Sequence, residues 1–323
     1  MRYIVAALAT SAITATAAAA DVGVDPNLPS YEPTSGVSGS LTSIGSDTLN
    51  NLMTLWAEGY RSHYPNVSIE IQGAGSGTAP PAMVEGTAQF GPMSRPMRDT
   101  EIEEFEQRYG YEPTPIRGAI DALAVYVHRD NPLECLSLQQ VDAIFSSTRN
   151  GGLDSALNAW GDVGLEGEWA NRPMALYGRN SASGTYGYFR EVALFGGDYR
   201  GEVREQPGSS AVVQGVASDI NAIGYSGIGY ATADVRAVPI SAEEAGECFE
   251  AVGENAVTGD YPIARFLYIY VNKDPNDDLD PLRAEFIRYV YSQEGQSDVL
   301  RAGFFPVVDA LADQDLEVFG LTN

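Results

Sequence analysis

The sequence predicts an α/β protein of two lobes, each a mixed sheet flanked by helices, joined by two crossing strands. Its 323 residues exceed one comfortable hydrophobic core, and 44% of them are hydrophobic, which is enough for two cores. Two long apolar strands of similar composition are expected at 122–127 and 264–271. If both strands cross between the lobes, the first lobe consists of 41–121 and 268–323, and the second lobe, 122–267, is inserted.

The first forty residues contain no part of either predicted lobe. Residues 1–20 combine Arg2, the apolar run Tyr3–Ala9 and a small-residue end at Ala20, which predicts a secretory signal cleaved after Ala20. No later stretch approaches the roughly 20 apolar residues of a membrane span, so we expect a soluble, exported protein. Residues 21–40 are rich in Pro, Gly and Ser without apolar periodicity, which predicts an extended arm or linker.

The charge of the chain excludes several classes of partner. Acidic residues number 44 against 19 basic ones, and the formal net charge is −25, so nucleic acid and anionic membranes are not expected to bind. Lys273 is the single lysine, which excludes a lysine-rich phosphate site. This composition fits either a salt-adapted organism or an ordinary acidic exported protein. A bound anion must therefore be held by local dipoles and arginine rather than by overall charge.

The clearest candidate site follows the predicted strand Met174–Tyr177. The turn after it is rich in Gly, Ser and Asn and opens a helix, whose unpaired N–H groups attract anions. Gly184 permits close approach to the backbone, Ser183 and Thr185 add hydroxyl donors, and Arg179 can bind an oxyanion through two bonds. In the competing interpretation, Ser183 or Ser181 is an ordinary helix N-cap and Arg179 a surface ion-pair partner.

A second turn of this kind precedes a predicted helix over 49–64. The strand Leu41–Ile44 ends shortly before Ser46, Asp47 and Thr48, which lie where the helix begins. Asp47 is either a plain N-cap or an acceptor that selects a protonated oxyanion.

Two further strand ends carry similar residues. The strand Val67–Ile71 leads into a Gly-rich turn with Ser76, followed by a short helix that begins at Pro80. The spacing of these glycines is not that of a dinucleotide fingerprint. Ser94 and Arg95 follow another short strand, just before an acidic helix over 99–109. Because ligands bind at the carboxyl ends of parallel strands, these turns are expected to converge.

The remaining elements complete the two lobes. In the second lobe, helices are expected over 137–145 and 212–221, and a Gly-rich strand and turn over 222–230. Helices over 281–291 and 294–302 are expected to close the first lobe.

The sequence lacks the residues of an enzyme. Neither His63 nor His128 has the partners of a Ser-His-Asp triad, and no metal-binding or nucleotide-binding motif occurs. We therefore predict binding without catalysis, with no metal and no cofactor. Cys135 and Cys248 either form a disulfide or are two separate thiols.

From Leu41 to the C-terminus, the chain resembles the periplasmic phosphate-binding proteins of phosphate-specific ABC transporters, in the type II periplasmic-binding-protein superfamily. The most specific motif is Gly178-Arg-Asn-Ser-Ala-Ser-Gly-Thr185. The resemblance implies a periplasmic monomer that clamps inorganic phosphate between two lobes and delivers it to a permease in the inner membrane. The phosphate-binding residues that it implies are Thr48, Leu49, Ser76, Arg179, Ser183, Gly184 and Thr185.

One position departs from the usual pattern of this family. Ser94 lies where the family usually has an aspartate, which accepts a proton from phosphate and repels sulfate, and Arg95 follows it. Asp47 is the candidate replacement for that acceptor. Arg95 is either a second cation in the site or an ion-pair partner of Asp47.

Three other functions are open at this point. The first is a receptor for another tetrahedral oxyanion, namely sulfate, molybdate or tungstate. The second is a secreted phosphatase, and the third is an adhesion or scaffolding role for the arm at 21–40.

Overall fold

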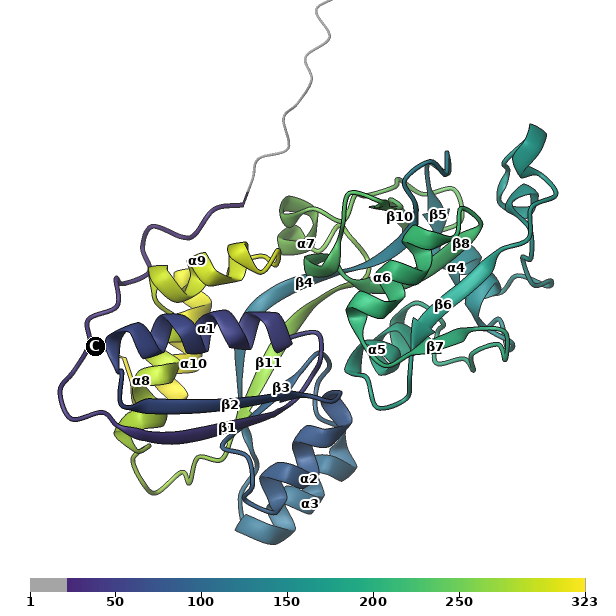
Figure 1. Cartoon of the computed structure of the whole chain (residues 1–323). Coiled ribbons are helices and arrows are strands. Elements are labelled where there is room, and N and C mark those ends of the chain that lie inside the picture. The colour runs from purple at the N-terminus through teal and green to yellow at the C-terminus, as the bar shows by residue number, and fades with distance from the viewer. Residues whose placement is uncertain (1–21, 323) are drawn as a thin grey trace, which may run out of the picture.

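The computed structural model describes residues 22–322, so the predicted signal peptide lies outside the described residues. Two lobes lie side by side and are joined by the long strands β4 (Thr114–His128) and β11 (Ala264–Val271) (Figure 1). We call them lobe I, whose main core draws on residues 28–119 and 267–321, and lobe II, whose core draws on residues 122–263. Across the described part of the chain, no helix is long and apolar enough to cross a membrane.

Lobe I is built from both parts of the chain. Its elements before β4 are β1 (Gly39–Gly45), α1 (Asn50–His63), β2 (Val67–Gly73), the 3-10 turn η1 (Ser76–Thr78), α2 (Ala79–Val84), β3 (Phe90–Met93) and α3 (Asp99–Tyr109). After β11 come α8 (Pro281–Val290), α9 (Gln293–Arg301) and α10 (Asp309–Val318).

Lobe II is continuous between the two crossing strands. Its longer elements are α4 (Leu138–Phe145), β6 (Ala175–Arg179), α5 (Gly184–Val192), α6 (Ser209–Ser218), β8 (Ala222–Gly227) and α7 (Gly253–Thr258). The short ones are β5 (Leu136–Ser137), η2 (Trp160–Val163), η3 (Gly167–Trp169), β7 (Arg204–Gln206), η4 (Ile228–Tyr230), β9 (Val235–Ala237) and β10 (Ile240–Ser241).

One strand path runs through both lobes in the order β2-β1-β3-β11-β4-β8-β6-β7. Residues 114–122 of β4 pair with β11, and residues 123–127 pair with β8, so β4 belongs to the sheets of both lobes. Strands β1, β2 and β3 are parallel, as are β8, β6 and β7. The turns that follow β1, β2 and β3 therefore lie at one edge of the lobe I sheet.

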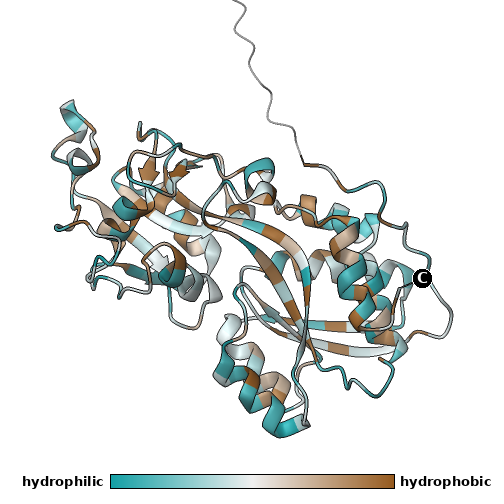
Figure 2. Cartoon of the chain, turned by 180° about the vertical axis from the view of Figure 1, so that it is seen from behind, coloured by the Kyte–Doolittle hydropathy of each residue, from teal (hydrophilic) through white to brown (hydrophobic). Residues whose placement is uncertain are grey.

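Hydrophobic residues concentrate on the strands, whereas α3 carries mainly hydrophilic residues (Figure 2). The second half of β4, Leu123–Val127, is fully buried. A strand that is covered on both faces has a continuous apolar sequence. This is why the segment could be predicted from the sequence.

Of the two predicted roles of the segment 21–40, an extended arm or a linker, the described residues from 22 onward fit an arm that packs against lobe I. Leu28, Tyr31 and Val37 are buried in the lobe I core, and β1 already begins at Gly39. The hydroxyl of Tyr31 donates to a carboxylate oxygen of Glu285 at 2.9 Å. Three spaced apolar side chains and one buried hydrogen bond therefore bind this segment to lobe I without regular secondary structure.

Two helices also differ from the prediction. Helix α6 covers Ser209–Ser218 rather than 212–221, because Asp219 adopts an extended conformation that ends the helix. Helix α10 was not predicted, since its sequence is dominated by acidic and small residues. Its buried residues are Ala312, Asp315 and Leu316, so tertiary contacts rather than a strong apolar stripe define the helix.

Cys135 and Cys248 form a disulfide in lobe II, with their Cα atoms 6.2 Å apart. The bond closes a loop over a sequence separation of 113 residues, so it restricts the unfolded chain strongly. Replacing both cysteines with alanine should lower the free energy of unfolding by about 2–4 kcal/mol. The free energy of unfolding is measured by chemical denaturation of the oxidised protein, the reduced protein and the variant. Equal midpoints for all three would show that the bond does not stabilise lobe II.

Candidate functional site

The predicted anion-binding turns converge where the two lobes meet. The hydroxyl oxygens of Thr48, after β1, and Thr185, at the start of α5, are 2.9 Å apart. The hydroxyl oxygens of Ser76, after β2, and Ser94, after β3, are 3.3 Å apart. All four side chains are buried. The structure therefore brings predicted residues from four separate strand ends into one inter-lobe cleft.

Two glycines allow this close contact between the lobes. A Cβ atom at Gly184 would lie 2.2 Å from the hydroxyl oxygen of Ser76 and 2.7 Å from that of Ser94. Gly75 has a φ of +115°, and a Cβ atom there would lie 2.6 Å from the carbonyl oxygen of Ala182. That carbonyl also accepts a hydrogen bond of 3.0 Å from the N–H of Gly77.

Two hydroxyl groups of the cleft, those of Ser76 and Ser183, accept hydrogen bonds from the main chain. Ser76 Oγ accepts from the N–H of Ser94, and Ser183 Oγ accepts from the N–H groups of Thr185 and Tyr186. Ser183 thus serves as the N-cap of α5, as the simpler interpretation held. Because protein donors occupy lone pairs of these oxygens, their own hydrogens are available for a bound acceptor. Such an arrangement suits an anion.

Arg179 is the buried cation of the cleft, with only 1% of its side chain exposed. Its Nη1 donates to Ser209 Oγ at 2.7 Å, and its Nη2 donates to the carbonyl oxygen of Pro207 at 3.1 Å. Its Nε is buried and has no hydrogen-bond partner. Burial lowers the pKa of Arg179, and the nearby carboxylate of Asp47 opposes that shift. An unpaired buried donor on a cation is costly unless an acceptor is supplied.

Asp47 does not cap α1, which excludes one of its two predicted roles. The N-cap of α1 is Leu49, and no side chain caps this helix. Instead, Oδ2 of Asp47 accepts from the N–H and the hydroxyl of Ser209, both at 2.8 Å, and lies 3.2 Å from Nη1 of Arg179. The hydroxyl of Tyr230 donates to the main-chain oxygen of Asp47 at 2.7 Å. Asp47 therefore links lobe I to the start of α6 in lobe II.

Arg95 does not pair with Asp47, contrary to one of the two alternatives left open by the sequence. Its Nη1 and Nη2 each donate to the carboxylate of Glu101 at 2.7 Å, and Nη1 also donates to the carbonyl oxygen of Pro96. Burial alone would raise the pKa of Glu101, but the bonds from Arg95 and from the N–H of Arg98 lower it. Arg95 thus secures the start of α3. The cation that faces Asp47 is Arg179.

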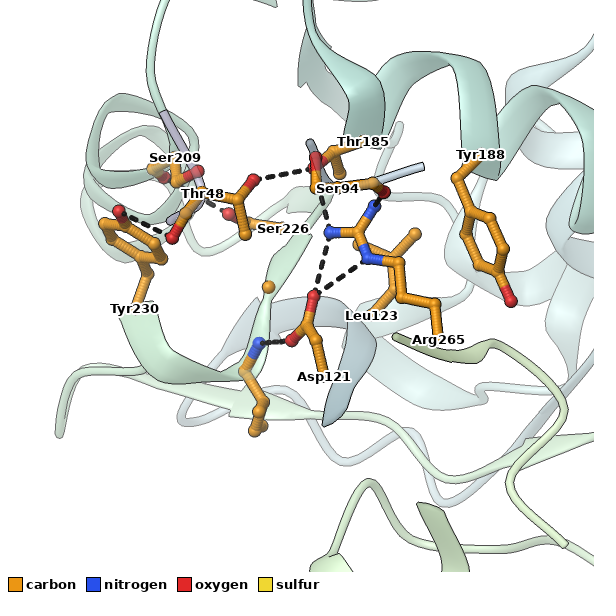
Figure 3. Close-up of polar contacts among 12 residues, drawn as sticks. Thr48, Ser94, Asp121, Leu123, Thr185, Tyr188, Ser209, Ser226, Tyr230 and Arg265 are labelled. Atoms are coloured by element: carbon orange, nitrogen blue, oxygen red, sulfur yellow. Dashed lines mark hydrogen bonds and ion pairs between the residues drawn. The ribbon is translucent and has the colours of Figure 1, made fainter. Parts of the chain in front are cut away.

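Sequence reasoning missed two charged residues on the crossing strands, Arg265 of β11 and Asp121 of β4 (Figure 3). Nε and Nη2 of Arg265 donate to Oδ2 of Asp121 at 3.0 and 2.8 Å, and both side chains are buried. Nη2 also donates to Thr185 Oγ1 at 2.9 Å. The available signal was an acidic residue within β4 and a basic residue within β11, both in largely apolar strands.

Ser209 and Tyr230 were also missed, because their roles depend on contacts between the lobes. Within residues 22–322, no three His, Cys, Asp or Glu side chains are grouped as a metal ion would require. The cleft residues provide a buried guanidinium, oriented hydroxyls and the uncapped N-terminus of α1. These groups can bind an oxyanion.

Two α/β lobes that meet over such a cleft and share two crossing strands are typical of solute-binding proteins. A family model described as a PBP superfamily domain matches residues 30–294. The chain is 54% identical over 321 residues to the phosphate-binding protein PstS of Pseudomonas aeruginosa, covering 99% of both chains. It is also 26% identical to PstS of Staphylococcus haemolyticus, covering 78% of this chain and 77% of the relative.

A solved structure from Clostridium perfringens, described as a phosphate ABC transporter substrate-binding protein with bound phosphate, has a TM-score of 0.70. It is 27% identical, and the match covers 83% of this chain and 100% of the other. The chain therefore belongs to the PBP superfamily and, within it, to the family of PstS phosphate-binding proteins. The predicted fold class and the resemblance drawn from the sequence are confirmed.

Proposed function

We propose that the chain binds inorganic phosphate in the cleft between its lobes and delivers it to the permease of an ABC transporter, without breaking a bond. The observation that carries this proposal is the buried guanidinium of Arg179, whose Nε has no partner within the protein. A phosphate oxygen would supply the missing acceptor. The proposed ligands are Thr48, Leu49, Ser76, Ser94, Arg179, Ser183, Gly184 and Thr185, with Asp47 as the acceptor for a phosphate proton. Arg95 was also among the predicted ligands, but we leave it out because its guanidinium is bound to Glu101.

The names of relatives support phosphate as the ligand. The Pseudomonas aeruginosa relative is a phosphate-binding protein, and the Clostridium perfringens structure contains bound phosphate. Both are binding proteins rather than enzymes by name, which agrees with the expectation of binding without turnover.

The cleft can supply enough binding free energy for a phosphate anion in spite of the protein's net charge of −25. A hydrogen bond to a charged group contributes about 1.5–3 kcal/mol, and micromolar affinity requires about 8 kcal/mol. A small number of such bonds from Arg179 and the oriented hydroxyls is therefore sufficient. Since the cleft residues are buried, these bonds are formed away from bulk water.

The location and assembly of the protein follow from the same proposal. The leader is removed after Ala20, the mature chain acts in the periplasm as a monomer, and its permease lies in the inner membrane. The segments 41–121 and 268–323 form one closing half, and the inserted segment 122–267 forms the other.

Selection of phosphate over sulfate is expected to depend on Asp47. All contacts of its carboxylate described above use Oδ2, so Oδ1 can accept a proton from a phosphate hydroxyl. Replacing Asp47 with Asn should lower the phosphate-to-sulfate affinity ratio by roughly 10-fold, because a charged acceptor contributes more than a neutral one. Competition between labelled phosphate and sulfate near neutral pH measures the ratio. An unchanged ratio in the variant would assign the selection to other groups.

The competing functions are separated by two assays on the purified chain. Displacement of labelled phosphate by sulfate, molybdate and tungstate tests for a receptor of another oxyanion. A sensitive ester-hydrolysis assay tests for a phosphatase. The proposal predicts weak displacement by all three anions and no hydrolysis, and stronger binding of any of them would overturn the assignment of phosphate.

A further inference from the structure

Arg265 and Asp121 lie at the point where the two lobes are joined. They are neighbours across the antiparallel pair of β11 and β4, the strands that connect the lobes. The exposed fractions of their side chains are 2% and 0%. Oδ1 of Asp121 accepts from the N–H of Ile228 at 2.9 Å, so the carboxylate is fixed on both sides (Figure 3).

The guanidinium of Arg265 contacts three separate parts of the molecule. Besides its bonds to Asp121, Nη1 donates to the main-chain oxygen of Ser94 in lobe I at 2.7 Å. Its Nη2 donates to Thr185 Oγ1 of α5 in lobe II at 2.9 Å. The ring of Tyr188, also on α5, lies 5.4 Å from the guanidinium carbon, and its hydroxyl donates to the main-chain oxygen of Ala264. One buried cation thus bonds to both lobes beside the cleft.

The bond from Arg265 also orients a predicted ligand of phosphate. Arg265 can only donate, so Thr185 Oγ1 accepts at this contact and must direct its own hydrogen elsewhere. Thr48 Oγ1 lies 2.9 Å from Thr185 Oγ1 on the opposite wall of the cleft. The hydrogen of Thr185 is consequently directed to Thr48 or to a bound anion.

We propose that Arg265 is a positioning residue that holds the two lobes in the closed arrangement and thereby slows the release of phosphate. Asp121 and the main-chain oxygen of Ser94 hold the guanidinium on the lobe I side, because β11 pairs with β3 just before Ser94, and the bond to Thr185 joins it to lobe II. This inference rests on the proposed function, because the rate of phosphate release is its main measure. Since opening of the cleft would separate Arg265 from Thr185, loss of Arg265 should speed release and leave association nearly unchanged.

The main test is the charge-conserving variant Arg265→Lys. A lysine keeps Asp121 paired, but its single ammonium group cannot reach the carboxylate, Ser94 and Thr185 in the same geometry. The second variant, Asp121→Asn with Arg265→Gln, removes both buried charges together and so avoids an unpaired carboxylate. The matched control is Arg117→Lys, since Arg117 also lies on a crossing strand and pairs with Asp315, but within lobe I alone.

Release is measured by diluting protein loaded with radiolabelled phosphate into excess unlabelled phosphate. We expect Arg265→Lys and the double variant to release phosphate roughly 10- to 100-fold faster than the unmodified chain, with association rates within about 3-fold. Arg117→Lys should release phosphate at the unmodified rate. The inference is overturned if Arg265→Lys releases phosphate within about 2-fold of the unmodified rate, or if Arg117→Lys has the same effect as Arg265→Lys.

A second measurement separates this inference from the proposed function. Spin labels on cysteines that replace the exposed residues Glu103 and Gln214 report the distance between the lobes without any ligand. The unmodified chain should show a larger closed fraction than Arg265→Lys. If the unmodified chain fails to bind phosphate, the proposed function is wrong, and this distance distribution alone decides the role of Arg265. If the unmodified chain and Arg265→Lys then show equal closed fractions, the inference that Arg265 holds the lobes together is overturned.

Discussion

Replacing Arg179 with Ala is expected to raise the Kd for phosphate by roughly 10²–10³-fold, the largest effect of any single substitution in the cleft. The variant loses the unpaired Nε donor and leaves Asp47 without its cation. A hydrogen bond to a charged group contributes about 1.5–3 kcal/mol, so loss of one or two bonds from the guanidinium to phosphate accounts for the expected rise in Kd. Arg179→Lys should recover only part of the affinity, because an ammonium group cannot replace bonds from Nη1, Nη2 and Nε together.

The matched control for this prediction is Arg236→Ala. Arg236 is an arginine of lobe II that is less deeply buried than Arg179, and it donates to the main-chain oxygens of Asn131 and Leu133, away from the cleft. Burial lowers the pKa of both arginines, so each variant removes a cation whose charge burial disfavours. Calorimetric titration with phosphate compares them. A Kd within tenfold of the unmodified value for Arg179→Ala would contradict the central place of Arg179.

Replacing Gly184 with Ala is expected to weaken phosphate binding by about 100-fold or more, although it adds only one methyl group. That methyl group would lie 2.2 Å from Ser76 Oγ, so the lobes cannot meet without a shift of α5 or of the turn after β2. The expected cost of such overpacking is about 1–3 kcal/mol, and the lost bonds from both walls add to it.

Gly187→Ala in the same helix is the control for Gly184→Ala. The nearest atom to a Cβ at Gly187 is Cδ of the flexible Arg95 side chain, at 3.3 Å, so this variant should fold and bind normally. Scattering profiles with and without phosphate should show closure for Gly187→Ala and an open form for Gly184→Ala. If Gly184→Ala closes and binds like the unmodified chain, the close packing at Ser76 is not required.

The local sequence predicted the turns of the site because each turn carries its own signal. Ser183, Gly184 and Thr185 follow an apolar strand and open a helix, and the same holds for the turns that contain Thr48 and Ser76. Because ligands bind at the carboxyl ends of parallel strands, these turns could be expected to converge without knowledge of the register.

The residues that the sequence did not reveal are those that depend on contacts between distant segments. Asp121 and Arg265 meet only because β4 and β11 pair in one particular register, over a separation of 144 residues. The side-chain partners of Asp47, Ser209 and Arg179, lie on α6 and β6 in the other lobe. Helix periodicity and turn composition carry no information about such pairs.

Arg95 shows the opposite case, in which a local partner was overlooked. Glu101 lies six residues further along the chain, and its carboxylate accepts hydrogen bonds from both terminal nitrogens of Arg95. Both alternatives for Arg95, a second cation in the site or a partner of Asp47, gave weight to the family pattern at Ser94 and neglected the acidic helix that follows. The buried residues of the arm, such as Tyr31, were missed because isolated apolar side chains in a Pro-rich segment have no period.

The most direct test of the account is calorimetric titration of the ligand-stripped mature chain with phosphate, and in parallel with sulfate, near neutral pH. The account predicts one phosphate per chain with micromolar or tighter Kd, and sulfate binding that is at least about 10-fold weaker. Absence of phosphate binding, or tighter binding of sulfate, would contradict the assignment of the cleft as a phosphate site.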